Sequence, residues 1–300
     1  MPSLLKRVLV GRPLSTHEAE HQRLPKSIAL ATFSSDPISS TAYATEEILF
    51  VTAVGASSLA LGLDKLAPMA IAVAILLTIV VTSYRRTIFA YPQGGGSYVV
   101  SRENLGKLPS LVAGASILVD YILTVAVSAS AGVAAILSLE TFRDLVPHRV
   151  LMTLFFVALL TAGNLRGLKE SGKIFAAPTY IYITLMSVMV GYGLFHSYVG
   201  DLDPVPFDPE LTEDMKETGG QLSLFILLRG FSSGAVALSG VEAISDGVPA
   251  FRKPQAKNAA TTLTVLGVIL GTLFLGVSIL ASRLHPFPTH DETVISQLGR

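Results

Sequence analysis

Seven long apolar stretches alternate with short polar connections along this chain of 300 residues. Each stretch is close to the ~20 residues that a helix needs to cross a bilayer. The predicted spans cover residues 27–54, 66–84, 110–140, 149–165, 174–197, 222–248 and 259–283. The pattern predicts an all-α polytopic membrane protein: an N-terminal tail over residues 1–26, a transmembrane domain over 27–285, and the start of an extracellular loop over 286–300.

Two of these spans carry similar polar interruptions. Phe33-Ser34-Ser35-Asp36-Pro37 lies in the first span, and Phe231-Ser232-Ser233-Gly234 lies in the sixth. Unwound backbone at membrane depth is tolerated only where it lines a cavity or is buried in protein. Interrupted spans in corresponding positions indicate the binding site of a transporter. We therefore expect helices one and six to be broken around such a site.

The repetition of the break also predicts how the chain is organised. Because the break returns after five spans, the repeat unit has five spans, and an odd number makes the second copy enter the membrane inverted. Two units would need ten spans. This chain supplies one unit and the first two spans of another, so we expect it to be a piece of a longer protein.

Charge sets the expected orientation. The acidic loop after span five contrasts with the basic residues in the alternate connections, and positive residues favour the cytoplasmic side. The basic residues of the alternate connections are Lys6, Arg7, Arg12, Arg23 and Lys26 before span one, Arg85, Arg86, Arg102 and Lys107 after span two, Arg166, Lys169 and Lys173 after span four, and Arg252, Lys253 and Lys257 after span six. We predict a multi-pass protein of the cell membrane with a cytoplasmic N-terminus.

Composition narrows the function. Charged residues make up 15% of the chain, against about 25% in soluble domains. The net charge is zero, so bulk charge does not indicate nucleic acid, and without cysteine there can be no disulfide or thiolate metal site. The sequence also has no cluster of histidines of the kind that would indicate a zinc or copper site. We expect a transporter that is not an enzyme and that contacts membrane lipid.

Asp36 is the first candidate for chemistry. Pro37 removes a backbone donor and disfavours helical geometry at the residue before it. We expect the helix to open at Asp36 and to free carbonyl oxygens beside the carboxylate. The alternative is that Asp36 only caps a half-helix. Tyr43 lies seven residues later, where two helical turns would bring its hydroxyl to the same site, although it could equally be a packing residue.

The third and sixth spans supply further oxygen atoms. Asp120, Thr124 and Ser128 follow each other at intervals of four, which places them on one helix face. The alternative role for the two hydroxyl residues is hydrogen bonding between helices. Span six contributes Ser239 and Glu242.

Asp36, Asp120 and Glu242 have no basic residue at comparable depth, so these hard oxygen ligands favour an alkali or alkaline-earth cation. Repulsion among neighbouring carboxylates could keep a proton on one of them, which offers a route to proton coupling.

Three successive glycines follow span two. Gly94, Gly95 and Gly96 allow tight turns and close approach, so we expect a re-entrant segment or a gate. A flexible loop is the alternative. Phosphate binding is disfavoured because no lysine followed by serine or threonine comes after the glycines.

These motifs resemble those of one family. Phe33-Ser34-Ser35-Asp36, Ala90-Tyr91-Pro92-Gln93-Gly94-Gly95-Gly96 and Val119-Asp120-Tyr121-Ile122-Leu123-Thr124 are similar to segments of the KimA-type potassium transporters. These belong to the KUP family of the amino acid–polyamine–organocation superfamily. The resemblance extends over essentially the whole chain. One departure is Ser239, where the family pattern has threonine.

The resemblance implies a LeuT-like fold of five plus five inverted helices, here about seven helices with helices one and six broken. It implies potassium import by proton symport across a bacterial plasma membrane, with no cofactor besides the transported potassium ion and proton. The implied cation-binding or coupling residues are Asp36, Tyr43, Asp120, Thr124, Ser128, Ser239 and Glu242, with potassium at Asp36, Asp120 and Glu242. Family members continue into a C-terminal domain that dimerises and binds a cyclic dinucleotide, so a homodimer would form through a region outside this chain.

Other functions remain open at this point. An amino acid permease on the same scaffold is the main alternative, although a carboxylate at Asp36 would repel the carboxylate of the substrate. An intramembrane aspartyl protease would use Asp36 and Asp120 as a pair, but the local motifs do not fit. A passive channel is distinguished from a carrier by the proton dependence of its flux.

Overall fold

The computed structural model describes residues 23–55, 58–165, 168–200, 202–205, 222–287, 289 and 292–300. Over this part of the chain the structure consists of helices and connections, with one isolated bridge between Leu24 and Phe251. The prediction of an all-α polytopic membrane protein is therefore confirmed. The basic residues of the tail up to position 22, Arg166 and the acidic residues at positions 206–217 lie outside the described residues.

The elements follow one another as a series of long helices with short ones at the interruptions. They are α2 (Lys26–Ser40), α3 (Ala44–Leu49), η2 (Phe50–Val54), α4 (Leu59–Ala90), α5 (Gly96–Asn104), α6 (Lys107–Leu137), η3 (Glu140–His148), α7 (Arg149–Asn164), α8 (Leu168–Val199), α9 (Leu224–Gly234), η5 (Ala235–Leu238), α10 (Ala243–Asp246), η6 (Val248–Ala250), α11 (Gln255–Leu284) and α12 (Val294–Gly299).

Six segments within the described residues are long and apolar enough to cross a membrane. They correspond to predicted spans two to seven and are Leu59–Ala90, Lys107–Leu137, Glu140–Asn164, Gly172–Val199, Leu224–Asp246 and Gln255–Leu284. The predicted first span is absent from this set because it is divided between α2, α3 and η2. Predicted boundaries are off by a few residues, most of all for α4, which is longer than expected at both ends.

The first span breaks later than predicted. The helix does not open at Asp36: α2 continues through Pro37 to Ser40, and a turn over residues 41–43 leads into α3. Pro37 cannot donate to the preceding turn, yet a single missing bond is accommodated within the helix. Beyond it, the Ser39 hydroxyl donates to the Asp36 carbonyl and the Thr41 hydroxyl to the Ile38 carbonyl, both at 2.7 Å. These side chains satisfy backbone oxygens where the regular ladder ends.

This break also corrects the expected position of Tyr43. The residue precedes the first turn of α3 with φ −127° and ψ −15°, so two continuous helical turns do not separate it from Asp36. Asp36 is not an N-cap either, because it lies near the end of α2.

The sixth span is interrupted as expected. α9 ends at Gly234, η5 follows, and the backbone then turns at Gly240, where φ is +78°. A residue with a side chain rarely adopts this left-handed conformation. The chain resumes as the short helix α10. Both interrupted spans therefore consist of two helical halves joined by turns.

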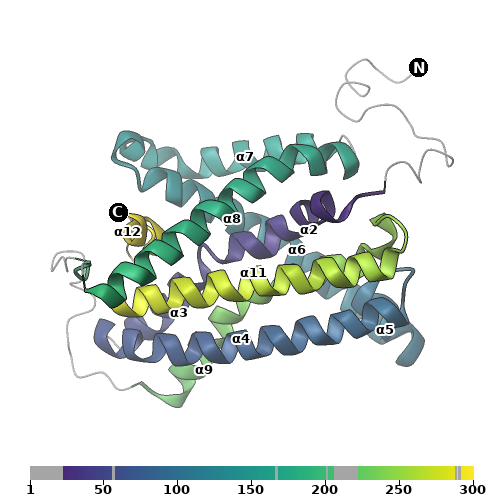
Figure 1. Ribbon diagram of the computed structural model, residues 1–300, viewed down its shortest axis with the longest axis horizontal. Helices are drawn as coiled ribbons and strands as arrows, with labels where there is room; N and C mark the ends of the chain where they lie inside the picture. Colours follow the sequence, from purple (N-terminus) through teal and green to yellow (C-terminus); the bar gives the residue numbers. More distant parts are fainter. Residues whose placement is uncertain are drawn as a thin grey trace.

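The two interrupted spans pack against each other. α3 lies against α9, and α2 lies against η5. Glycines make this approach possible: a Cβ on Gly234 would come within 2.6 Å of Ile48, and one on Gly230 within 2.7 Å of Thr52. Around them, α11 packs most extensively on α4 and also contacts α8 and α2 (Figure 1). The core is thus built around the interrupted helices, while α7 buries no residue and presents an apolar surface.

The segment after α11, expected to be a loop, contains a short helix that folds back onto the bundle. α12 buries Val294 and Leu298 in the core. The backbone N–H of Val294 donates to the Glu46 carboxylate at 3.1 Å, and that of Thr293 donates to the Ser138 hydroxyl at 3.1 Å. The end of the described chain is therefore tied to α3 and α6.

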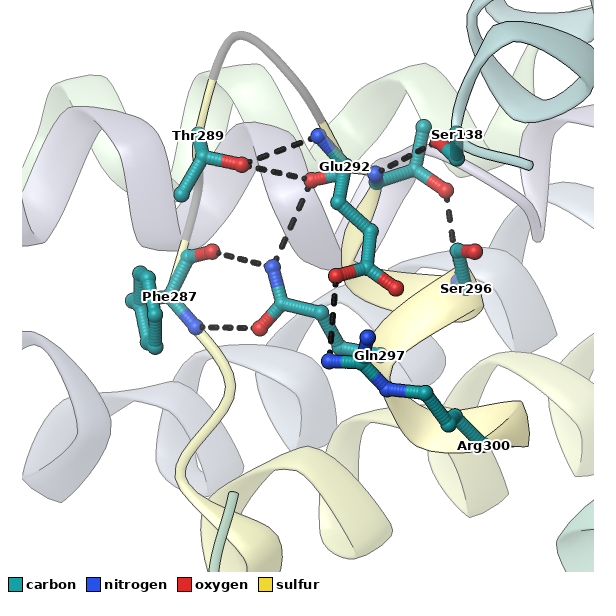
Figure 2. Close-up of polar contacts among 8 residues, drawn as sticks. Ser138, Phe287, Thr289, Glu292, Ser296, Gln297 and Arg300 are labelled. Carbon is teal, nitrogen blue, oxygen red and sulfur yellow. Dashed lines mark hydrogen bonds and ion pairs between the residues drawn. The ribbon is translucent and has the colours of Figure 1, made fainter. Parts of the chain in front are cut away.

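Gln297 holds this segment together from inside (Figure 2). Its amide oxygen accepts from the backbone N–H of Phe287 at 3.1 Å. Its amide nitrogen donates to the carbonyls of Phe287 and Glu292 at 2.7 and 3.3 Å. The side chain is 6% exposed, so these bonds have little competition from water.

Gln297→Ala should release α12 from the bundle. The substitution removes the three hydrogen bonds that Gln297 makes to backbone groups of Phe287 and Glu292, each worth about 0.5–1.5 kcal/mol. Hydrogen exchange should accelerate over residues 285–300 and stay unchanged in α4 and α11. Ser296→Ala, which leaves the Gln297 bonds intact, is the control. Equal exchange in both variants would contradict this role for Gln297.

Candidate functional site

One group of polar contacts joins α6 to the turn of the sixth span. The hydroxyl oxygens of Thr124 and Ser239 lie 3.0 Å apart. The Ser239 hydroxyl also lies 3.2 Å from Oδ2 of Asp120, to which it can donate. Ser239 therefore connects two of the three predicted positions on α6, and a hydroxyl is present where the family pattern has threonine.

A second group joins α6 to the break in the first span. The Ser128 hydroxyl lies 3.1 Å from that of Ser39 and 3.3 Å from that of Tyr43. Tyr43 in turn lies 3.1 Å from the Ser40 hydroxyl. Asp120, Thr124 and Ser128 thus all face the interrupted spans, as their spacing predicts. Ser39 and Ser40 were not among the predicted site residues, although their position after Pro37 was a usable signal.

Asp36 faces the turn of the sixth span. Its Oδ2 lies so near Gly240 that a Cβ on that glycine would be 2.5 Å away. Its Oδ1 is buried and has no hydrogen-bond partner among the described residues. A buried carboxylate oxygen without a partner is costly. Asp36 therefore presents an acceptor that a ligand could satisfy.

The carboxylates form a negative region. Asp36 and Asp120 lie close enough to repel each other, and Glu242 is close enough to be repelled by both. Glu242 is half-buried beside the turn, whereas Asp120 is exposed. The ion pairs Lys65–Asp64 and Arg300–Glu292 do not involve this region.

The three carboxylates do not converge into one cage. Within the described part of the chain, no three His, Cys, Asp or Glu side chains come close enough together to hold a metal ion. An ion at this place would be held by a mixed set of oxygens, in which hydroxyl and carbonyl groups add to one or two carboxylates. Such sets suit hard cations.

A cavity of 790 Å³ opens beside Tyr43. Its apolar lining comes mainly from α6, and its polar lining comes from Tyr43, Glu46, Glu47, Ser130, Arg149, Thr153, Tyr182 and Thr293. Since Tyr43 is also bonded to Ser128, this residue stands between the cavity and the hydroxyl groups described above.

The predicted glycine turn lies at the opposite side of the site. Gly94, Gly95 and Gly96 have φ values of +80°, +89° and +39°. The turn leads into α5 and contacts the end of α10, where Asp246 lies. Asp246 was not among the predicted site residues, because a carboxylate near the end of a span is ordinarily solvated. Its distance of four residues from Glu242, one helical turn, was the available signal.

Comparison with known proteins identifies relatives of the chain. Residues 26–284 match a family model described as "Amino acid permease". The chain is 46% identical over 296 residues to "Potassium transporter KimA" of Bacillus subtilis (strain 168). That alignment covers 98% of this chain and 47% of the relative, so the chain spans about half the length of the curated relative that it matches.

Proposed function

The chain belongs to the amino acid permease family, and we propose that within this family it forms part of a carrier that imports potassium ions. The observation that carries the proposal is the meeting of Asp36, Ser239 and the α6 hydroxyls at the two helix breaks. The relative named as a potassium transporter, at 46% identity, supports the same ion.

The proposed site replaces the hydration shell of the ion with protein oxygens. Potassium entering from the cavity would exchange water for the hydroxyls of Tyr43 and Ser128, then for those of Thr124 and Ser239. The carboxylates of Asp36 and Asp120 supply negative charge at membrane depth, where an unpaired charge is expensive. Binding of a cation therefore relieves a cost that the empty site carries.

The broken helices supply the movement. Each half of an interrupted span can tilt without breaking a continuous hydrogen-bond ladder, and carriers of this kind alternate access around a site at the breaks. α3 and α9 form one pair of packed halves, and α2 packs on η5, at the junction of the sixth span. Opening one pair while the other stays closed would expose the site to one side only.

We further propose that potassium enters together with a proton. Asp36, Asp120 and Glu242 repel one another, and a proton on one of them lowers this repulsion. Glu242 suits this role because it is half-buried and precedes α10, the short inner segment of the sixth span. In this scheme the residues that face the ion are Asp36, Tyr43, Asp120, Thr124, Ser128 and Ser239. We also propose that the N-terminus is cytoplasmic, and that the end of the bundle where Arg85, Lys107 and Lys257 lie faces the cytoplasm.

Uptake in cells tests the proposal. The full-length protein, expressed in bacteria that lack their own potassium uptake systems, should accumulate radioactive rubidium, and excess potassium should compete. A protonophore, applied with the membrane potential clamped, should reduce the uptake. Accumulation of a labelled amino acid that excess potassium does not affect would contradict the proposal and favour the family's other substrate class. If rubidium flux does not depend on the proton gradient, only the proposal of proton symport is contradicted.

A further inference from the structure

The glycine turn and Asp246 fit together closely. The backbone N–H of Gly95 donates to the carbonyl of Asp246 at 3.2 Å. A Cβ on Gly94 would overlap with that same carbonyl, and a Cβ on Gly96 would overlap with Oδ1 of the Asp246 side chain. All three glycines have positive φ. Only glycine combines this backbone geometry with such close approach.

A second helix holds the other oxygen of the same carboxylate. The Tyr121 hydroxyl of α6 donates to Oδ2 of Asp246 at 3.2 Å. Oδ1 is buried against the glycine turn and has no hydrogen-bond partner among the described residues. One oxygen of the carboxylate is thus bonded to α6 and the other lies against the glycine turn.

Asp246 is also connected to the proposed ion site. Its backbone N–H donates to the carbonyl of Glu242 at 3.0 Å, so the two carboxylates lie one turn apart on the same short segment. Tyr121 is the direct neighbour of Asp120. A displacement of Glu242 or Asp120 would therefore be transmitted to the contact among Asp246, Tyr121 and the glycine turn.

We propose that Asp246 is a positioning residue that fastens α10 to the glycine turn and to α6, and so closes the ion site on the side of the bundle that carries α5. This inference rests on the proposed carrier function. Asp246 does not touch the ion. It holds the inner half of the sixth span in place, and its release from Gly96 and Tyr121 opens the path from the site to the solution.

A cysteine reporter can follow this opening directly. None of the 300 residues is cysteine, so one introduced thiol in this chain is unambiguous. Ser245 is 2% exposed, and its hydroxyl has no hydrogen-bond partner among the described residues, so Ser245→Cys removes no visible bond. Labelling of this thiol by a membrane-impermeant maleimide, added to inside-out vesicles, measures how often α10 moves away from the turn.

The thiol of the Ser245→Cys variant, without a second substitution, should be labelled slowly. Asp246→Ala and Gly96→Ala should each raise the labelling rate about tenfold or more, since the first removes a half-buried carboxylate and the second displaces it from the turn. Asp246→Asn, which keeps an acceptor for Tyr121, should raise it less. Gly106→Ala is the matched control: Gly106 has φ +94°, but a Cβ there would meet nothing within 4 Å. It should stay within about twofold of the reporter alone.

Rubidium uptake by the same variants, without the reporter, gives the second measurement. Asp246→Ala should lower the maximal rate about tenfold while KM changes less than about threefold, because the lost contacts do not involve the ion. Unchanged labelling in Asp246→Ala, or a KM that rises in proportion to the loss of rate, would overturn the inference. Labelling does not depend on the transported substrate, so failure of the potassium proposal would leave this test decisive.

Discussion

Replacing Asp36 with asparagine is expected to abolish rubidium uptake and to leave the protein folded in the membrane. The substitution keeps the shape of the side chain and removes its charge. A unit charge 4 Å from a carboxylate gains about 4 kcal/mol at an effective dielectric constant of about 20, which corresponds to about a thousandfold in affinity. The Oδ1 atom of Asp36 has no partner among the described residues, so the exchange costs no hydrogen bond there.

Uptake must be normalised to the amount of protein in the membrane for this result to count. Asp64→Asn is the control, because Asp64 is exposed near the start of α4 and pairs with Lys65. It should transport like the unmodified protein. An Asp36→Asn variant that keeps uptake within a few-fold of the unmodified protein would remove Asp36 from the ion site.

Replacing Gly240 with alanine is expected to cause the second-largest loss. The added Cβ would lie 2.5 Å from Oδ2 of Asp36 and 2.8 Å from Cδ of Pro37. The φ of +78° adds strain of about 1 kcal/mol for a residue with a side chain. Because the turn cannot move without displacing the first span, we expect uptake to fall at least about tenfold and thermal stability to decrease.

Gly106→Ala is again the control, because it distinguishes the effect of backbone strain from the effect of a new side-chain contact. Its φ of +94° imposes a similar backbone cost, but the new methyl group would meet open space. This variant should lose some stability and keep its uptake. If both alanine variants lose uptake equally, close packing between the turn and Asp36 is not what the carrier requires.

The regular parts of the fold could be predicted because they depend on local pattern. The length of an apolar run determines whether a helix can cross the bilayer, and a spacing of four residues brought Asp120, Thr124 and Ser128 to one face of α6. The repeated Phe-Ser-Ser motif correctly marked both interrupted spans. Each of these inferences needs only residues that are neighbours in the sequence.

The location of the first break could not be predicted in the same way. Pro37 indicated an opening at Asp36, but one missing backbone bond is a small defect in a well-packed helix. The chain turns only where the hydroxyls of Ser39 and Thr41 bond to backbone carbonyls. Whether a serine or threonine bonds to its own backbone or to a neighbouring helix depends on tertiary packing, and the sequence does not record it.

Asp246 and α12 were missed for a related reason. Asp246 lies against a glycine turn that is far away in sequence, and α12 is held by Gln297 and by Glu46 of another helix. Short segments are marginal as isolated helices. Their structure follows from contacts that only the folded chain provides.

Location of the bound ion tests the central claim most directly. The structure of the full-length protein should be determined in rubidium or thallium, with anomalous scattering used to find the ion. The account predicts a peak among the oxygens of Asp36, Asp120 and Ser239, and its loss in Asp36→Asn. A peak elsewhere with this space empty, or density for an amino acid between the two helix breaks, would contradict it.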